Sequence, residues 1–312
     1  MKIKRTVNKI ILALLPAVLW TGCEKEEPYY NIQPETAYIN FFLASDVMKK
    51  RDYVRIYVND SVPNEIYTRY PLMDAISLGR IEYPYTTAGN NNQDLVGWTR
   101  NTLGYVFYMP LEPGEQKVIF TNGANNRNNQ GSDTRIFLKD SLLNLAKGSF
   151  TNVYLADDVE NNAFRIVTTS EDRDMPVEKG KTSLRVINLC PDAGPLLISR
   201  VYDDGHNEEV EGFPAVLPFG EYTAYTSFST EGIEAELNSL VFSIASAHNP
   251  YVELLTAAIP AIEGAMHTLL IHGFQYPVTR GIINGYDPYV GLPLYQNYEF
   301  TPSLRTTLRR SR

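Results

Sequence analysis

The sequence contains 312 residues with a formal net charge of −8, and only 28 residues are Lys or Arg. This acidic balance argues against a nucleic-acid-binding protein, because phosphate contacts need clustered cations. Two cysteines are too few for a disulfide framework. The 21 Tyr, 13 Phe and 19 Pro favour strands and turns over helices.

The N-terminus has the order of a secretory signal. Basic residues at 2–9 precede an apolar run at 10–19, and a small residue then leads to Cys23. A Cys after a small residue resembles the lipobox of bacterial lipoproteins, where the signal is cut before the Cys and the thiol is acylated. We predict a signal peptide at 1–22, lipidation of Cys23 and an outer-membrane anchor. An ordinary signal peptide is the alternative, since Trp20 stands where the lipobox usually has Leu.

A charged cluster follows the predicted anchor. Lys25, Glu26 and Glu27 resemble the surface-export signal of Bacteroidota lipoproteins, which predicts display on the cell surface. A solvated tether over 23–35 is compatible with that interpretation. Cleavage before Cys23 removes four cations and no acid, so the net charge moves from −8 to −12. The acyl chains would then be the only membrane contact.

Short strand signals bounded by turn residues recur from residue 36 onward. A charged stretch with Pro and Gly at 171–181 interrupts them and marks the best domain boundary. We therefore predict an all-β protein with two tandem antiparallel β-sandwiches, at 36–175 and 182–300. Only 138–147 and 252–262 have a pattern that suits short helices. The basic segment 301–312 is expected to be a disordered tail, with contact to an acidic partner or a lipopolysaccharide phosphate as the alternative.

The strand pattern restarts in a way that suggests an internal repeat. Residues 37–46 align with 183–192 at an offset of 146, 105–114 with 223–232 at 118, and 148–155 with 264–271 at 116. The shrinking offsets imply that the first copy is longer, with an inserted loop at 79–103. Because identities are few, chance similarity between two β domains is the alternative.

Several motifs in the second half resemble one protein family. Residues 185–193 read RVINLCPDA, a D-G turn follows at Asp204, and the segments FGEY at 219–222 and TLLIHG at 268–273 complete the set. This pattern, over roughly 182–285, resembles domain of unknown function 4397. The resemblance implies immunoglobulin-like β-sandwiches, often in tandem, on secreted or anchored bacterial proteins. It implies no catalytic residue.

No catalytic, metal or cofactor motif is present. The four histidines match no metal-binding spacing, and no nucleophile elbow, phosphate loop or dinucleotide fingerprint occurs. The acidic clusters at 157–160 and 203–204 lack calcium-loop spacing, so we interpret them as solvated turns. Cys190 is expected to be a small buried residue.

The inserted loop is the one candidate binding segment. Tyr83, Tyr85 and Trp98 surround an amide-rich run at 90–93. Aromatic faces beside amides suit a sugar or peptide ligand. The alternative is that these rings cap the edge of a sandwich.

These observations predict a non-enzymatic surface lipoprotein with a binding or adhesion role. Its ligand would be a glycan or a protein, or the chain would be a subunit of a surface complex. Two alternatives remain open: a glycan-processing enzyme or accessory subunit of a polysaccharide-utilisation system, and a purely structural spacer.

Overall fold

The computed structural model describes residues 33–49, 54–59, 73–74, 81–84, 106–122, 136–171, 175–231, 239–287 and 289–311. Apart from the short helix α2 (Asp46–Lys49), the regular elements in these ranges are strands. The prediction of an all-β sandwich fold is therefore confirmed. Among the described residues, no helix is both long and apolar enough to span a bilayer.

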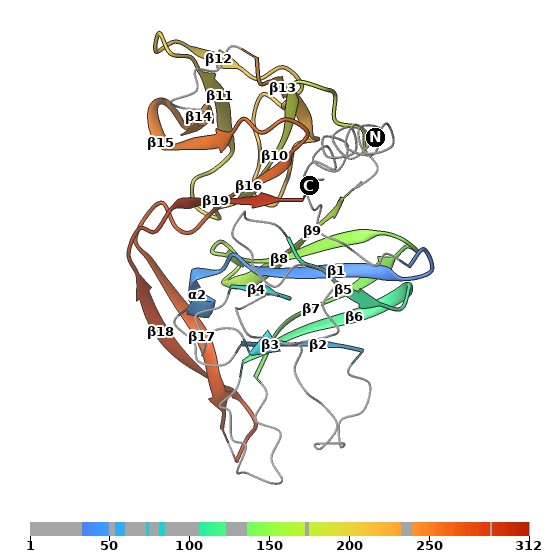
Figure 1. The fold of residues 1–312 in the computed structure, drawn as a ribbon. Coiled ribbons are helices and arrows are strands. Elements are labelled where there is room, and N and C mark those ends of the chain that lie inside the picture. The colour runs from blue at the N-terminus through green and yellow to red at the C-terminus, as the bar shows by residue number, and fades with distance from the viewer. Residues whose placement is uncertain are drawn as a thin grey trace, which may run out of the picture.

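The described strands form four larger sheets and one separate hairpin, which we number in spatial order (Figure 1). Sheet 1 contains β3 (Met73–Asp74), β2 (Val54–Val58), β6 (Gly114–Asn122) and β7 (Ile136–Leu145). Sheet 2 contains β4 (Glu82–Tyr83), β1 (Ala37–Leu43), β8 (Phe150–Asp158) and β9 (Ala163–Glu171), with β5 (Met109–Leu111) also paired to β1. Sheet 3 contains β13 (Thr226–Ser229), β10 (Lys181–Leu189), β16 (Met266–His272) and β19 (Arg305–Arg310). Sheet 4 contains β12 (Asn207–Glu209), β11 (Leu196–Val201), β14 (Ser239–Ser246) and β15 (Asn249–Pro260).

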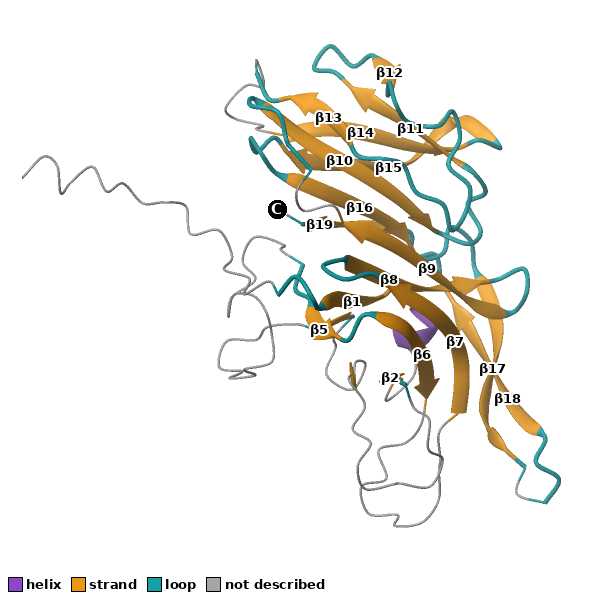
Figure 2. Cartoon of the chain, turned by 90° about the vertical axis from the view of Figure 1, so that its right-hand side faces the viewer, coloured by secondary structure: helices purple, strands orange, loops and turns teal. Residues whose placement is uncertain are grey.

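The four sheets lie face to face in one stack, as Figures 1 and 2 show. One hydrophobic core joins sheets 1 and 2, and a second joins sheets 3 and 4. A third, smaller cluster fills the space between sheets 2 and 3 with side chains from both. Apolar contacts therefore run through all four layers.

The two central sheets are buried on both faces. In β1, Phe41 packs against Phe120 of sheet 1, with ring centroids 6.2 Å apart. Its neighbour Phe42 points the other way and packs against His272 of sheet 3, at 5.8 Å. Because successive side chains of a strand alternate between faces, every residue of such a strand is buried. This explains why β1 reads as a nearly continuous apolar run.

The two pairs of sheets have the same strand arrangement. In sheet 2, β1 and β8 are parallel neighbours, and β10 and β16 are parallel neighbours in sheet 3. The order β3-β2-β6-β7 of sheet 1 likewise matches the order β12-β11-β14-β15 of sheet 4. This correspondence agrees with an internal repeat, although the duplication itself stays a prediction.

The predicted residue alignment of that repeat is wrong by one position. With Thr151 and His267 matched at the predicted offset of 116, the strand registers match Ile39 with Leu184, an offset of 145 rather than 146. The predicted offset instead places Ile39, which faces a core, opposite Arg185, which faces the other sandwich. A one-residue slip exchanges the two faces of a strand. The registers of β5 and β13 likewise differ by one position from the predicted alignment of 105–114 with 223–232.

A hairpin made of β17 (Val278–Tyr286) and β18 (Pro293–Phe300) leaves sheet 3 and covers the first sandwich. Phe274, Ile282 and Phe300 from this excursion belong to the core of sheets 1 and 2. The predicted domain 182–300 thus contributes side chains to the first core.

The two ends of the excursion are held together where the chain leaves sheet 3. The Phe274 amide donates to Ser303 Oγ at 3.0 Å, and the Ser303 amide donates to the Phe274 carbonyl at 2.8 Å. Gly273, with φ of 92°, lies so close that a Cβ there would meet the Ser303 carbonyl oxygen at 2.4 Å. Glycine is therefore required at this position.

Three predicted elements are wrong. The candidate helices at 138–147 and 252–262 are the strands β7 and β15, whose residues pair with the neighbouring strands β6 and β14. The predicted disordered tail contains β19, which pairs with β16 over six residue pairs. Arg305 and Arg309 of this strand form ion pairs with the first sandwich, as described below.

A substitution tests the packing of the excursion. We expect Phe274→Ala to lower the free energy of unfolding by about 3–5 kcal/mol, because it opens a cavity in a core the hairpin shares with sheets 1 and 2. Urea unfolding followed by circular dichroism measures this loss. Tyr276→Ala, at a side chain 56% exposed, should change stability by less than about 0.5 kcal/mol. Equal effects would contradict the shared core.

Candidate functional site

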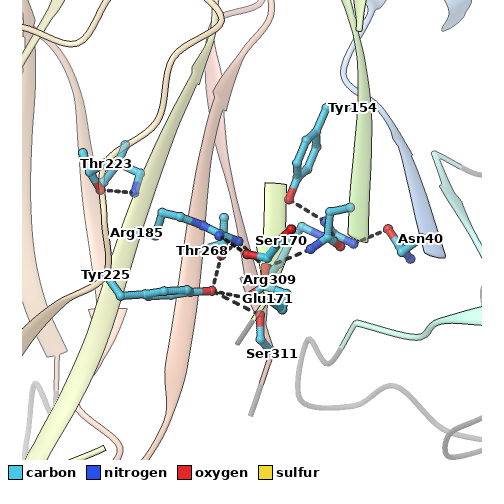
Figure 3. A network of polar contacts seen from close by, with 12 residues as sticks. Asn40, Tyr154, Ser170, Glu171, Arg185, Thr223, Tyr225, Thr268, Arg309 and Ser311 are labelled. Carbon is cyan, nitrogen blue, oxygen red and sulfur yellow. Dashed lines mark hydrogen bonds and ion pairs between the residues drawn. The ribbon is translucent and has the colours of Figure 1, made fainter. Parts of the chain in front are cut away.

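Two arginines of sheet 3 reach across the space between the central sheets and bind polar groups of sheet 2 (Figure 3). Arg309 of β19 donates to Asn40 Oδ1 at 2.6 Å, to the Tyr154 hydroxyl at 3.1 Å and to Glu82 at 2.5 Å. Its guanidinium also lies 5.3 Å from the ring centroid of Phe42. One side chain of the C-terminal strand therefore binds three strands of sheet 2.

Arg185 of β10 makes the second connection. It forms a buried ion pair with Glu171 of β9 and donates to the Ser170 carbonyl at 3.0 Å. Glu171 also accepts from the Tyr225 hydroxyl at 2.6 Å and from the Asn152 amide at 2.8 Å. Burial raises the pKa of Tyr225 well above its ordinary value. The phenol thus stays protonated and remains a donor to Glu171.

This buried network does not form a catalytic site. The side chains of Arg185 and Glu171 are 4% and 2% exposed, and their polar atoms are directed at one another. Cys190 is also buried, and burial raises the pKa of its thiol to about 12, so it is not a nucleophile at neutral pH. Its predicted burial is confirmed. No group of three or more His, Cys, Asp or Glu among the described residues is placed to hold a metal ion.

A second polar cluster ties α2 to the C-terminal segment. Asp157 accepts from Ser45 Oγ at 2.7 Å and from the Asp46 amide at 2.8 Å, with Arg280 of β17 at 3.7 Å. Asp46 in turn pairs with Arg305 of β19. The prediction of a solvated turn is therefore wrong for Asp157, which is 2% exposed. Desolvation raises its pKa to about 6, although Ser45 and Arg280 oppose that shift.

Most predicted site residues lie outside the described residues. This applies to Cys23, Lys25, Glu26, Glu27, Tyr85 and Trp98. Tyr83 lies on β4, pairs with Phe41 in the sheet and packs half-buried against the first core. This ring supports the sandwich edge, and a ligand role for it stays a prediction.

The outer face of sheet 4 carries a solvent-open groove of about 440 Å³. Its floor is formed by the central strands, where the small residues Ser199 and Ser243 lie side by side in register and Leu197 lies beside Ala245 two residues along. Large side chains at these positions would fill the face of the sheet. The size is within the range of small-ligand sites, which is roughly 300–1,000 Å³.

The rims of the groove come from the edge strands and one loop. Glu209 on β12 lies on one side, and Tyr251 and Glu253 on β15 lie on the other. Phe213 and Pro214, in the loop after β12, complete the wall. The lining contains these two carboxylates and no Lys, Arg or His.

Glu253 is fixed and ionised in this groove. Its carboxylate accepts from the hydroxyls of Ser243 and Thr256, each at 2.6 Å. These two hydrogen bonds lower its pKa, the Ser243 bond having the larger effect. Tyr251 is 96% exposed, so its ring face is available to a ligand.

Sequence reasoning missed this groove. The interpretation of 252–262 as a helix hid a strand in which a register shift between Glu253 and Leu255 brings Glu253 and Thr256 within hydrogen-bond distance. The available signal was Pro250 directly before an aromatic residue, which suits the start of an edge strand.

Part of the chain is similar to a known protein family. A family model described as a domain of unknown function (DUF4397) matches residues 103–199. The match runs from the residues before β5 to β11, so it covers strands of both sandwiches and a little under a third of the chain. It confirms the predicted resemblance to this family, but it shares only residues 182–199 with the predicted range. A comparison with curated proteins found no match.

The arginine network generates a stability prediction. Arg309→Met should lower the free energy of unfolding by about 3–5 kcal/mol, because Glu82 and Asn40 lose a buried charged partner. Denaturant titration measures the loss, and a double-mutant cycle with Glu82→Gln isolates the pair. Lys117→Met, at an exposed ion pair with Asp140, should cost less than about 1 kcal/mol. A loss at Arg309 no larger than at Lys117 would contradict the structural role of the network.

The buried carboxyl of Asp157 generates a pH prediction. Its folded pKa of about 6 exceeds the ordinary value of 3.8, so the folded state holds this proton more tightly than the unfolded state. Its stabilising contribution is present below the ordinary pKa and is lost as the pH rises to about 6. We expect the stability of the wild type relative to Asp157→Asn to fall between these values and then level off. A pH-independent difference in unfolding free energy would refute this.

Proposed function

We propose that the protein is a non-enzymatic lipoprotein, anchored in the outer membrane and displayed on the cell surface, that binds a ligand. The observation that carries this proposal is the groove on sheet 4, which opens to solvent on the outermost layer of the stack. The strand that follows the predicted tether, β1, lies two layers away in sheet 2. The stack would therefore hold the groove away from the anchored end.

The fixed contacts between the sandwiches support a display role. The ion pairs of Arg185 and Arg309 and the apolar cluster between sheets 2 and 3 hold the two sandwiches in one orientation. Because a rigid stack has no hinge between its sandwiches, no entropy is lost in ordering such a hinge when a ligand binds. A duplication of the first sandwich would account for the second sandwich, which carries the groove.

The enzyme alternative receives less support. Glycoside hydrolysis needs two carboxyl groups about 5–9.5 Å apart. Glu209 and Glu253 lie on strands at opposite edges of sheet 4, with two strands between them. Three strand spacings separate these backbones by about 14 Å. This is a backbone separation, and what supports a rim role for Glu253 is that both of its carboxylate oxygens already accept from the hydroxyls of Ser243 and Thr256.

Protease treatment of intact cells tests the display proposal. Wild-type protein should be shaved from the surface, and Cys23→Ala should leave the membrane fraction. Changing Lys25, Glu26 and Glu27 together to Ala should protect the protein from the protease while leaving it membrane-bound. A soluble periplasmic protein serves as the control for cell integrity. Protection of the wild type until the outer membrane is broken would show that the protein faces the periplasm.

A further inference from the structure

We infer that the groove on sheet 4 binds a neutral, hydroxyl-rich glycan, with Tyr251 as the stacking platform. This inference rests on the proposed binding function and names its ligand class. A ring that is 96% exposed at the rim of a concave site offers a flat apolar face to the medium. The apolar face of a sugar ring fits such a surface, and the hydroxyls at its edge remain free to bind polar groups.

The hydrogen-bonding groups of the groove match a ligand that both donates and accepts. Glu209 and Glu253 accept only, whereas Ser199 can donate and accept and the Asn207 amide supplies donors as well. A sugar hydroxyl satisfies both kinds of partner. An ammonium or guanidinium group donates only, so a basic peptide side chain would use the carboxylates and leave the Asn207 donors unmatched.

The charge of the groove excludes acidic ligands. Its two carboxylates have no cation beside them in the lining. Glu253 is held in its ionised form by two hydroxyl donors, which lower its pKa. A uronate, a phosphate or a sulfated sugar would therefore meet like charge on both rims. Among glycans, this selects neutral chains.

The size and shape of the groove favour a short stretch of a chain over a single buried sugar. The volume is about 440 Å³, and the floor of Ser199, Ser243 and Ala245 is open to solvent. The rims lie on strands about 14 Å apart, a span that exceeds one sugar ring. Tyr251 on β15 and the loop residues Phe213 and Pro214 after β12 all line the groove.

A binding screen on the purified full-length protein tests the inference. The probes are neutral oligosaccharides from glucans, mannans, xylans and galactans, with oligogalacturonate as the acidic control and an oligolysine peptide as the cationic control. We expect a neutral oligosaccharide to bind, oligogalacturonate not to bind, and Tyr251→Ala to weaken binding about tenfold in calorimetry. Glu253→Gln should weaken binding several-fold as well.

A matched control separates the groove from general loss of an exposed tyrosine. Tyr289, at the turn between β17 and β18, is 94% exposed and lies outside the groove lining. Tyr289→Ala should bind the same oligosaccharide as tightly as wild type, and all variants should keep the wild-type melting temperature.

Three results would overturn the inference: no neutral glycan bound, equal binding by Tyr251→Ala, or Glu253-dependent binding of oligolysine alone. The last result would assign the groove to basic segments. Surface shaving is scored separately, so the two proposals fail independently. If the protein is shaved from the cell surface but binds no glycan, only the proposed ligand class is wrong. If it binds a glycan but faces the periplasm, only the proposed surface display is wrong.

Discussion

The structure depends on the burial of both faces of sheets 2 and 3. A sheet in an ordinary sandwich keeps one face in water, so polar side chains on that face need no partner in the protein. Here that face is covered by the other sandwich, and an unpaired polar group on it costs free energy. The terminal nitrogens of Arg185 and Arg309 bind Glu171, Glu82, Asn40 and Asn152, whereas the Nε atom of each arginine has no partner among the described residues. Because these hydrogen bonds and ion pairs are directional, they form at one register and one orientation of the two sheets.

The same constraint shapes the functional surface. With sheets 2 and 3 enclosed, sheets 1 and 4 are the layers with an outward face, and the hairpin β17–β18 packs on the first sandwich. The outward face of sheet 4 is hollowed by small side chains in β11 and β14. The proposed binding groove thus lies at one end of a rigid stack. The charged groups buried inside the stack hold the two sandwiches in one orientation.

The sequence predicted the all-β class because β propensity and turn residues recur at short intervals, and these signals are local. The arginines of the C-terminal segment could not be placed this way, because Arg309 and Asn40 are 269 residues apart. The alternation of Arg305, Thr307 and Arg309 is a strand signal, but a cluster of cations at a terminus equally suits a solvated tail. The groove was missed for a related reason. Its members come from four separate strands and a loop, and their register in sheet 4 brings them together.

The long sequence separation between β19 and the residues it contacts in the first sandwich sets an order of assembly. Sheet 3 lacks its edge strand, and Asp46 and Glu82 lack their cationic partners, until residues 305–310 are available. Contacts between residues so far apart in the sequence form late, since the loop they close is long. A chain that emerges from N-terminus to C-terminus therefore cannot lock its sandwiches together before residues 305–310 have been synthesised. Pairing of β19 with β16 becomes the step that commits the two sandwiches to one rigid arrangement.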